Sequence, residues 1–216
     1  MADQKGVAQR LQMINSQLRT CDVNDRDLLA AFADTPREDF VAPAQRAQAY
    51  VDGEVASSGP PGRKLLSPRS LGLLLKCAAP APGERALVVG AGSGYCAALL
   101  AALGLDVVAL ETDASAARAA LGGRERISVV EGPLTEPPAA GGPFDVIVVN
   151  GAFEVAPDRL IAALKEGGRL TGLSARSEPK RVVLYERSGG GVSDRVLFDA
   201  AGDVLPGFAR TRAFAF

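Results

Sequence analysis

The spacing of hydrophobic residues changes about eighty residues into the chain. Before that point apolar residues recur at helical spacing, which predicts one apolar helix face made of Val7, Leu11, Ile14 and Leu18. A second helix is predicted to begin after a cap at Asn24 or Asp25 and to end before Pro36. A further helical pattern covers residues 70–79 and is closed by prolines. The first part of the chain is therefore expected to be helical.

Residues 53–68, GEVASSGPPGRKLLSP, interrupt this helical part. The stretch holds three glycines and three prolines in sixteen residues, which excludes a regular helix and argues against a central strand. A loop of this length inside a compact domain often serves binding or catalysis. We therefore expect a loop here that is either functional or disordered.

From residue 84 onward, strands and helices alternate. Short apolar strands are predicted at 85–89, 106–110, 127–130, 144–149 and 169–173, with helices at 95–103, 114–121 and 157–165. Such strands form a parallel sheet covered on both faces. Two more strands, at 181–186 and 195–198, are joined too closely for a parallel crossover and should pair antiparallel. The prediction is an α/β fold, with a seven-stranded, mostly parallel sheet, a C-terminal antiparallel hairpin and a helical N-terminal cap.

Composition narrows the functional classes. The 216 residues contain no histidine, which excludes Ser-His-Asp and Cys-His catalysis, and the three cysteines are scattered, so we expect no metal site. Charge is balanced, with 24 basic and 25 acidic residues, and the first ten residues lack the apolar core of a signal peptide. We expect a cytoplasmic protein with neither nucleic acid nor membrane as partner. We also expect a single domain over 1–216, with a cap and loop in 1–79 and the sheet in 80–216.

A glycine-rich turn carries the clearest chemical signal. The predicted cofactor contacts are Gly90, Ala91, Gly92, Ser93 and Gly94 in the turn, and Tyr95 at the start of the next helix. Glycine lets the backbone turn tightly against a ligand, and a helix N-terminus offers free N–H groups. Glu111 ends the following strand, where a carboxylate can accept both hydroxyls of a ribose. The alternative is that the turn only packs a strand against a helix and that Glu111 is solvated.

The same turn discriminates between adenosine cofactors. The dinucleotide fingerprint GxGxxG would place its last glycine at Tyr95, and the phosphate-binding pattern GxxxxGK[ST] does not occur. A nicotinamide-dependent oxidoreductase is therefore disfavoured. The turn and the terminal hairpin favour S-adenosylmethionine, with S-adenosylhomocysteine as the product of methyl transfer.

Several motifs resemble one family. The stretch from MINSQLRT to AQAYVD, with its QxR, PREDFV and AY-D marks, is followed in family order by PAPGERALVVGAGSGYCAALLA, LET, FDVIVVNGA and LKEGGRL. Together they resemble protein-L-isoaspartate O-methyltransferase over most of the chain. The resemblance implies a class I (Rossmann-like) methyltransferase fold, S-adenosylmethionine as methyl donor and the isoaspartyl carboxylate of damaged proteins as acceptor. It also assigns the three turn glycines and Glu111 to the cofactor.

The acceptor side departs from that family. Where the family reads GQTISQP, this chain has GRKLLSP, with Lys64 in place of threonine and Leu66 in place of serine. After the third strand, residues 131–133 read EGP instead of GDG, which removes a carboxylate expected near the adenine. After the fourth, Asn150-Gly151-Ala152 replaces Thr-Ala-Ala. The cofactor side is thus closer to the family than the acceptor side.

Candidate acceptor residues follow from the loop. Lys64 and Ser67 are the candidate catalytic residues, and Arg63 is a candidate to bind an acidic acceptor by charge-assisted hydrogen bonds. Each has a structural alternative: a solvated basic pair for Arg63 and Lys64, and a helix cap for Ser67. Asn150 is predicted to contact the cofactor, with turn formation as the alternative. Cys96 is expected to be a buried apolar residue.

The function predicted from these observations is methylation of isoaspartyl carboxylates. The expected partner is a protein or peptide that carries isoaspartate, or a small acidic molecule, and the protein could be a monomer or a dimer. Two alternatives remain open. One is a methyltransferase of the same fold with a different acceptor, and the other is a non-catalytic protein that binds S-adenosylmethionine.

Overall fold

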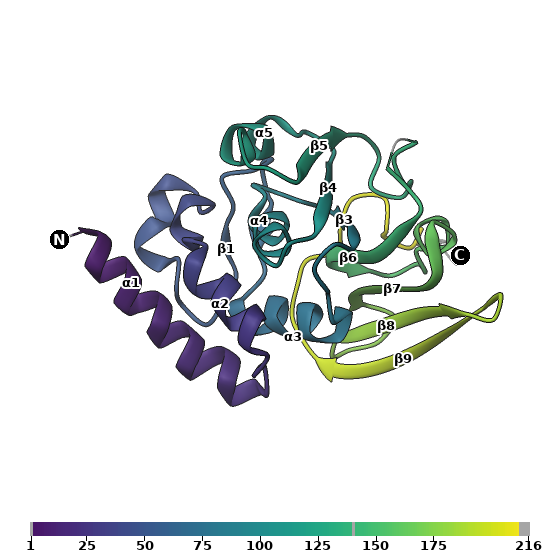
Figure 1. The fold of residues 1–216 in the computed structure, drawn as a ribbon, viewed down its shortest axis with the longest axis horizontal. Helices are drawn as coiled ribbons and strands as arrows, with labels where there is room; N and C mark the ends of the chain where they lie inside the picture. Colours follow the sequence, from purple (N-terminus) through teal and green to yellow (C-terminus); the bar gives the residue numbers. More distant parts are fainter. Residues whose placement is uncertain (1, 140, 212–216) are drawn as a thin grey trace, which may run out of the picture.

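The computed structural model describes residues 2–139 and 141–211 and is built around one seven-stranded sheet (Figure 1). Its strand order is β5-β4-β3-β6-β7-β8-β9. The first five in chain order pair in parallel: β3 (Arg85–Val89), β4 (Asp106–Glu111), β5 (Ile127–Glu131), β6 (Phe144–Phe153) and β7 (Leu164–Ser174). Strands β8 (Arg181–Ser188) and β9 (Gly191–Asp199) add antiparallel to one edge. The predicted mostly parallel sheet with a terminal hairpin is confirmed.

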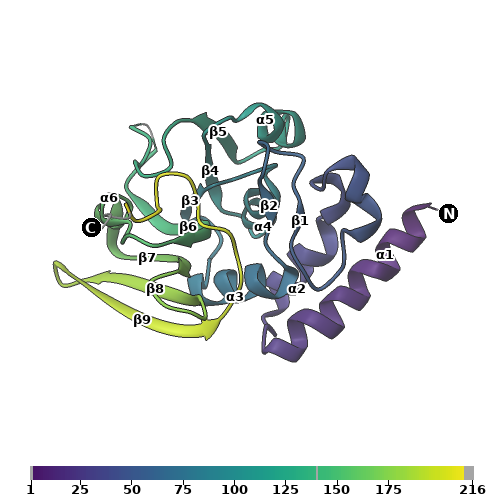
Figure 2. The ribbon, with the colours of Figure 1, turned by 180° about the vertical axis from the view of Figure 1, so that it is seen from behind.

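Helices of the N-terminal part gather at one side of the sheet (Figures 1 and 2). They are α1 (Ala2–Met13), which continues into a π-helical turn and a 3₁₀ turn, α2 (Arg26–Asp34) and α3 (Pro68–Ala78). Two 3₁₀ turns and the two-residue strands β1 (Val55–Ala56) and β2 (Lys64–Leu65) lie between α2 and α3. Asp25 caps α2 by accepting a hydrogen bond from the backbone N–H of Leu28, as predicted. No helix among the described residues is long and apolar enough to cross a membrane.

The two faces of the sheet bury different partners, because successive side chains of a strand point to opposite faces. In β3, Ala86 and Val88 join a core formed with α2, α3, α4 (Tyr95–Ala102) and α5 (Ser115–Leu121). Leu87 and Val89 join a second core with α6 (Asp158–Ala162) and the segment after β9. Figure 2 shows that segment, in yellow, crossing the second face. Both faces are thus covered, which explains the near-continuous apolar strands.

Three sequence predictions need correction. Val7 and Leu11 are 44% and 48% exposed, whereas Ile14 and Leu18 are buried. The reason is that α1 lies along the outside of the cap and the π-helical turn Ile14–Leu18 then changes the phase of the side chains. Helix α6 is shorter than predicted, because the chain enters β7 at residue 164. Strand β6 is longer than predicted, so Asn150 lies within it and not after it.

Arg37 of the PREDFV motif connects the cap to the loop that precedes α3. Its side chain is fully buried, and its guanidinium donates from Nε to the carbonyl of Ala49 and from Nη2 to the carbonyl of Leu66, both at 2.8 Å. The guanidinium also lies over the ring of Tyr95, 5.2 Å from the centroid. This motif residue therefore serves the architecture that supports the loop.

We expect the change Arg37→Met to lower the free energy of unfolding by about 1–3 kcal/mol, because two buried carbonyls lose their donors. Urea denaturation followed by circular dichroism would measure this loss. The matched control is Arg46→Met, since Arg46 lies in the same cap but forms an exposed ion pair with Asp39. Its loss should cost less than about 1 kcal/mol. Equal effects of the two changes would contradict the role assigned to Arg37.

Candidate functional site

Two cavities compete for the functional assignment. The larger, about 410 Å³, lies between α2 and the C-terminal ends of α3 and α4, near the starts of the strands. The smaller, about 220 Å³, lies where the strands end, and its lining includes Gly90, Gly92, Thr112 and Asn150. Ligands of open α/β sheets bind outside the carboxyl ends of the strands. We therefore assign the functional site to the smaller cavity, called the cleft below.

The glycine turn between β3 and α4 forms one wall of this cleft. Gly90, Gly92 and Gly94 all have positive φ, at 76°, 60° and 101°. Residues that carry a side chain rarely adopt a positive φ, so the turn requires glycine at these positions. The backbone N–H groups of Gly90 and Ala91 both donate to the carbonyl of Leu110 in β4. The turn is thus tied to the strand that ends in the candidate ribose-binding carboxylate.

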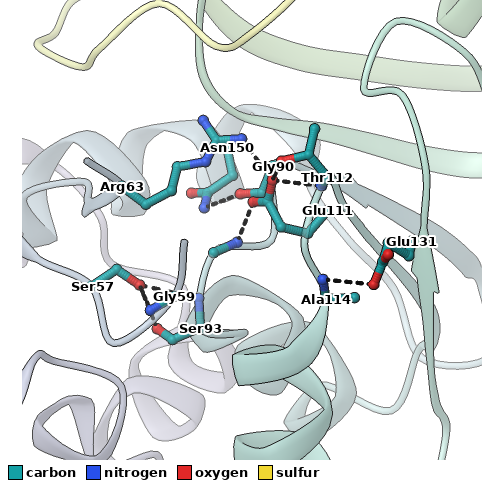
Figure 3. A network of polar contacts seen from close by, with 11 residues as sticks. Ser57, Gly59, Arg63, Gly90, Ser93, Glu111, Thr112, Ala114, Glu131 and Asn150 are labelled. Carbon is teal, nitrogen blue, oxygen red and sulfur yellow. Dashed lines mark hydrogen bonds and ion pairs between the residues drawn. The ribbon is translucent and has the colours of Figure 1, made fainter. Parts of the chain in front are cut away.

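Glu111 lies at the centre of a polar network beside this turn (Figure 3). Its side chain is fully buried, which excludes the solvated alternative. One carboxylate oxygen, Oε2, accepts from the N–H of Gly92 at 2.8 Å. The other, Oε1, accepts from the N–H and the hydroxyl of Thr112 and from Nη2 of Arg63. A buried carboxylate held at the glycine turn is the group that a ribose of an adenosine cofactor would require.

The loop 53–68 packs directly on the glycine turn. The hydroxyl of Ser57 accepts from the N–H groups of Ser93 and Gly59 and donates to the hydroxyl of Ser93 at 2.9 Å. The Ser93 hydroxyl in turn donates to the carbonyl of Phe40. A Cβ on Gly59 would lie 2.6 Å from the carbonyl carbon of Gly92, so only glycine allows this approach. The Ser93 side chain therefore fastens the loop and the cap to the turn.

Both basic residues of the loop face the cleft. Arg63 Nη2 lies 2.8 Å from Glu111 Oε1, and the Arg63 side chain is only 12% exposed. Lys64 Nζ lies 2.9 Å from Asp203 Oδ2 and 4.0 Å from Glu54 Oε2. These contacts raise the pKa of Lys64, chiefly through the hydrogen bond to Asp203. Both cations are thus paired with carboxylates. The solvated alternative does not hold for Arg63, whereas the Lys64 side chain is 45% exposed and keeps contact with solvent.

The next two loop positions, Leu66 and Ser67, contribute to packing and to a helix cap, and Leu66 also lines the cleft. Ser67 is the N-cap of α3, where its hydroxyl accepts from the N–H of Ser70 and donates to the Ser70 hydroxyl. Ser67 is not among the residues that line the cleft, and its hydroxyl forms the cap that the sequence also suggested. A catalytic role for this hydroxyl stays a prediction. Leu66 is buried and its side chain lies against Gly202. A serine at position 66 would leave a gap in that packing.

Tyr95 and Cys96 point away from the cleft. The Tyr95 ring lies in the core between Phe32 and Phe40, and burial raises the pKa of its hydroxyl to about 12. Any contact of Tyr95 with a cofactor is therefore made by its main chain. Cys96 is buried, and its pKa is raised to about 12 by that burial. The prediction that Cys96 is a packed apolar residue is confirmed.

Two further residues, Asn150 within β6 and Glu131 at the end of β5, lie near this wall of the cleft. Asn150 Nδ2 donates to the carbonyl of Gly90 at 3.0 Å and also lines the cleft, so it holds the turn from the side of β6. Glu131, which pairs with Glu111 in register, accepts from the N–H of Ala114 and from Arg118. The Glu131 carboxylate therefore forms its hydrogen bonds with the start of α5.

Sequence reasoning missed three residues that line the cleft, namely Thr112, Glu54 and Asp203, and it missed Ser57, which bonds the loop to the glycine turn. Thr112 directly follows Glu111 and could have been found from that position. Asp203 could not, because the segment after β9 reaches the cleft only by pairing with β6, where Leu205 N–H donates to the Ala152 carbonyl and Ala152 N–H donates to the Asp203 carbonyl. Among the described residues, no cluster of three or more potential metal ligands occurs.

Comparison with known proteins agrees with this geometry. Residues 8–196 match the family model for protein-L-isoaspartate(D-aspartate) O-methyltransferase. The chain is 38% identical over 169 residues to the protein-L-isoaspartate O-methyltransferase of Methylorubrum populi, covering 76% of this chain and 78% of that relative. The enzyme of the same name from Gloeobacter violaceus is 34% identical over 194 residues, covering 86% and 93%.

Solved structures support the fold. A protein-L-isoaspartate O-methyltransferase structure superposes with a TM-score of 0.79 at 22% identity, over 92% of this chain and 66% of that chain. A putative enzyme of the same kind from Plasmodium falciparum, solved in complex with S-adenosyl-L-homocysteine, has a TM-score of 0.77 at 20% identity, over 91% and 97%. The sheet and its terminal hairpin are thus shared with these structures.

Proposed function

Because the chain belongs to the protein-L-isoaspartate(D-aspartate) O-methyltransferase family, we propose that it transfers a methyl group from S-adenosylmethionine to the free carboxylate of isoaspartyl residues, which is carried on Cα, in proteins and peptides. The observation that carries this proposal is the buried Glu111 carboxylate at the glycine turn, with the loop 53–68 packed on the same turn. We further propose that the chain acts as a single domain in the cytoplasm.

The proposed cofactor-binding residues are of the kind that an adenosine group requires. Glu111 is the proposed partner of the ribose hydroxyls, and the main chain of the turn, residues 90–94, is the proposed partner of the amino-acid end. Asn150 holds the turn in shape through the Gly90 carbonyl. S-adenosylmethionine, when bound, supplies a methyl group on a positively charged sulfur. Everything else required of the protein is alignment of the acceptor and exclusion of water.

The acceptor needs no general base. A carboxyl group with an ordinary pKa of about 4 is already ionised at neutral pH. This agrees with a chain that contains no histidine. What an anionic acceptor does need is a positive partner, because its charge has to be held in place near the cofactor. Arg63, on the loop that faces the cleft, is the proposed partner, and Lys64 beside it is proposed to neutralise the carboxylates of Asp203 and Glu54.

A methyl-release assay tests the proposed reaction. The protein is incubated with radiolabelled S-adenosylmethionine and either an isoaspartyl peptide or the same peptide with normal aspartate, whose free carboxylate is carried on Cβ instead of on Cα. We expect base-labile methyl ester only on the isoaspartyl peptide. Equal labelling of both peptides would contradict the proposed specificity. Labelling of neither, with binding of S-adenosylhomocysteine intact, would point to a different acceptor.

A further inference from the structure

The carboxylate proposed to bind the ribose already accepts four hydrogen bonds from the protein, three of them on one oxygen. Glu111 Oε1 accepts three hydrogen bonds, from Arg63 and from the N–H and hydroxyl of Thr112, while Oε2 accepts from Gly92. The donors on Thr112 and Gly92 belong to the same wall of the cleft as Glu111. Arg63 is different, because it reaches Glu111 from the loop across the cleft. Its guanidinium therefore occupies a bonding direction that a ribose hydroxyl would need.

Arg63 can leave Glu111 without unfolding the loop. Its main chain is held separately, since its N–H donates to the Pro60 carbonyl and its carbonyl accepts from the Ser57 N–H. Ser57 is itself bonded to the glycine turn through Ser93. Only the side-chain torsions of Arg63 have to change. The loop and the turn keep their positions while the guanidinium moves.

The other charges of the cleft decide where a released guanidinium can act. Asp203 is a competing carboxylate on the lining, and it is paired with Lys64 at 2.9 Å. Lys64 also lies within 4.0 Å of Glu54. Because one cation already serves both carboxylates, Arg63 is left as the cation available to an incoming anion.

We infer that the ion pair of Arg63 with Glu111 blocks the proposed ribose-binding carboxylate and breaks when the cofactor binds. The freed Arg63 guanidinium then binds the acceptor carboxylate. This inference rests on the proposed function. It makes cofactor binding and acceptor binding cooperative, with the cofactor entering first. By linkage, an acceptor analogue that engages Arg63 tightens the binding of the cofactor by the same factor. Arg63 is thus a positioning residue that couples the two sites.

The variant Arg63→Ala tests this coupling by equilibrium binding. Calorimetry should show S-adenosylhomocysteine binding about three- to tenfold more tightly to the variant, because Glu111 no longer has to be freed first. In the wild type, saturating S-adenosylhomocysteine should tighten the binding of a fluorescent isoaspartyl peptide about tenfold. In the variant, the ratio of the peptide affinities with and without S-adenosylhomocysteine should fall to about one, and the KM for the peptide should rise. The matched control is Arg181→Ala, which breaks an exposed ion pair with Asp199 on the terminal hairpin and should change neither affinity.

The outcomes separate this inference from the proposed function. Suppose that the wild type binds S-adenosylhomocysteine and methylates the isoaspartyl peptide. If Arg63→Ala then binds S-adenosylhomocysteine equally or more weakly, the inference is overturned and the proposed function stands. The inference is also overturned, and the function left intact, if S-adenosylhomocysteine tightens peptide binding by the same factor in the variant as in the wild type. Failure of the wild type to bind S-adenosylhomocysteine would overturn both.

Discussion

Replacing Gly92 with valine is expected to weaken the binding of S-adenosylhomocysteine by more than a hundredfold, or about 2.7 kcal/mol. Gly92 has a φ of 60°, where a β-branched side chain is strained, and its N–H must still donate to Glu111. A Cβ here would also lie 3.4 Å from the Ser57 hydroxyl, at the contact between turn and loop. Titration calorimetry measures the loss, and far-UV circular dichroism should remain close to wild type.

Gly83→Val is the matched control for the backbone strain alone. Gly83 has a φ of 83° and lies in the turn before β3, where a Cβ would point into open space with no neighbouring atom within 4 Å. Both variants should lose stability because both place valine at positive φ. Only Gly92→Val should lose the ligand. Retained affinity in Gly92→Val would show that the turn is structural and does not hold the cofactor.

Removal of the Lys64 charge should lower kcat/KM for an isoaspartyl peptide about ten- to a hundredfold, the usual effect of losing a charge-assisted contact. In Lys64→Ala, the carboxylates of Asp203 and Glu54 lose their cation and face an anionic acceptor in the same cleft. Steady-state kinetics with the isoaspartyl peptide measures this effect, and affinity for S-adenosylhomocysteine should change little.

A second substitution tests whether the unpaired carboxylates cause the loss of activity in Lys64→Ala. The double variant Lys64→Ala with Asp203→Asn should recover part of the lost activity, because the unpaired negative charge is removed. The control Lys165→Ala breaks a similarly exposed ion pair with Asp145 at the other end of the sheet and should leave kinetics unchanged. If Lys64→Ala raised activity, Lys64 would be an obstacle to the acceptor. The threonine that the family has at this position would then be the better residue.

The sequence determined the individual strands, the glycine turn and the carboxylate beside it because each of these features is local. Strand β3, the turn 90–94, helix α4 and the end of β4 follow one another within about thirty residues, and each is set by its own periodicity and glycines. A carboxylate that ends the strand beside a glycine turn must lie near that turn. Glu111 could therefore be predicted without knowing how the rest of the chain packs.

Only the tertiary structure decided the acceptor side. Arg63 and Glu111 are 48 positions apart, and their contact depends on Gly59 and Ser57 packing on the turn. Asp203 reaches Lys64 because the segment after the hairpin returns along β6. Periodicity describes neighbours within an element, whereas these pairs arise from where separate elements cross. The glycine turn and Glu111 could thus be predicted from the sequence. How the charged side chains opposite them are paired could be known only from the folded protein.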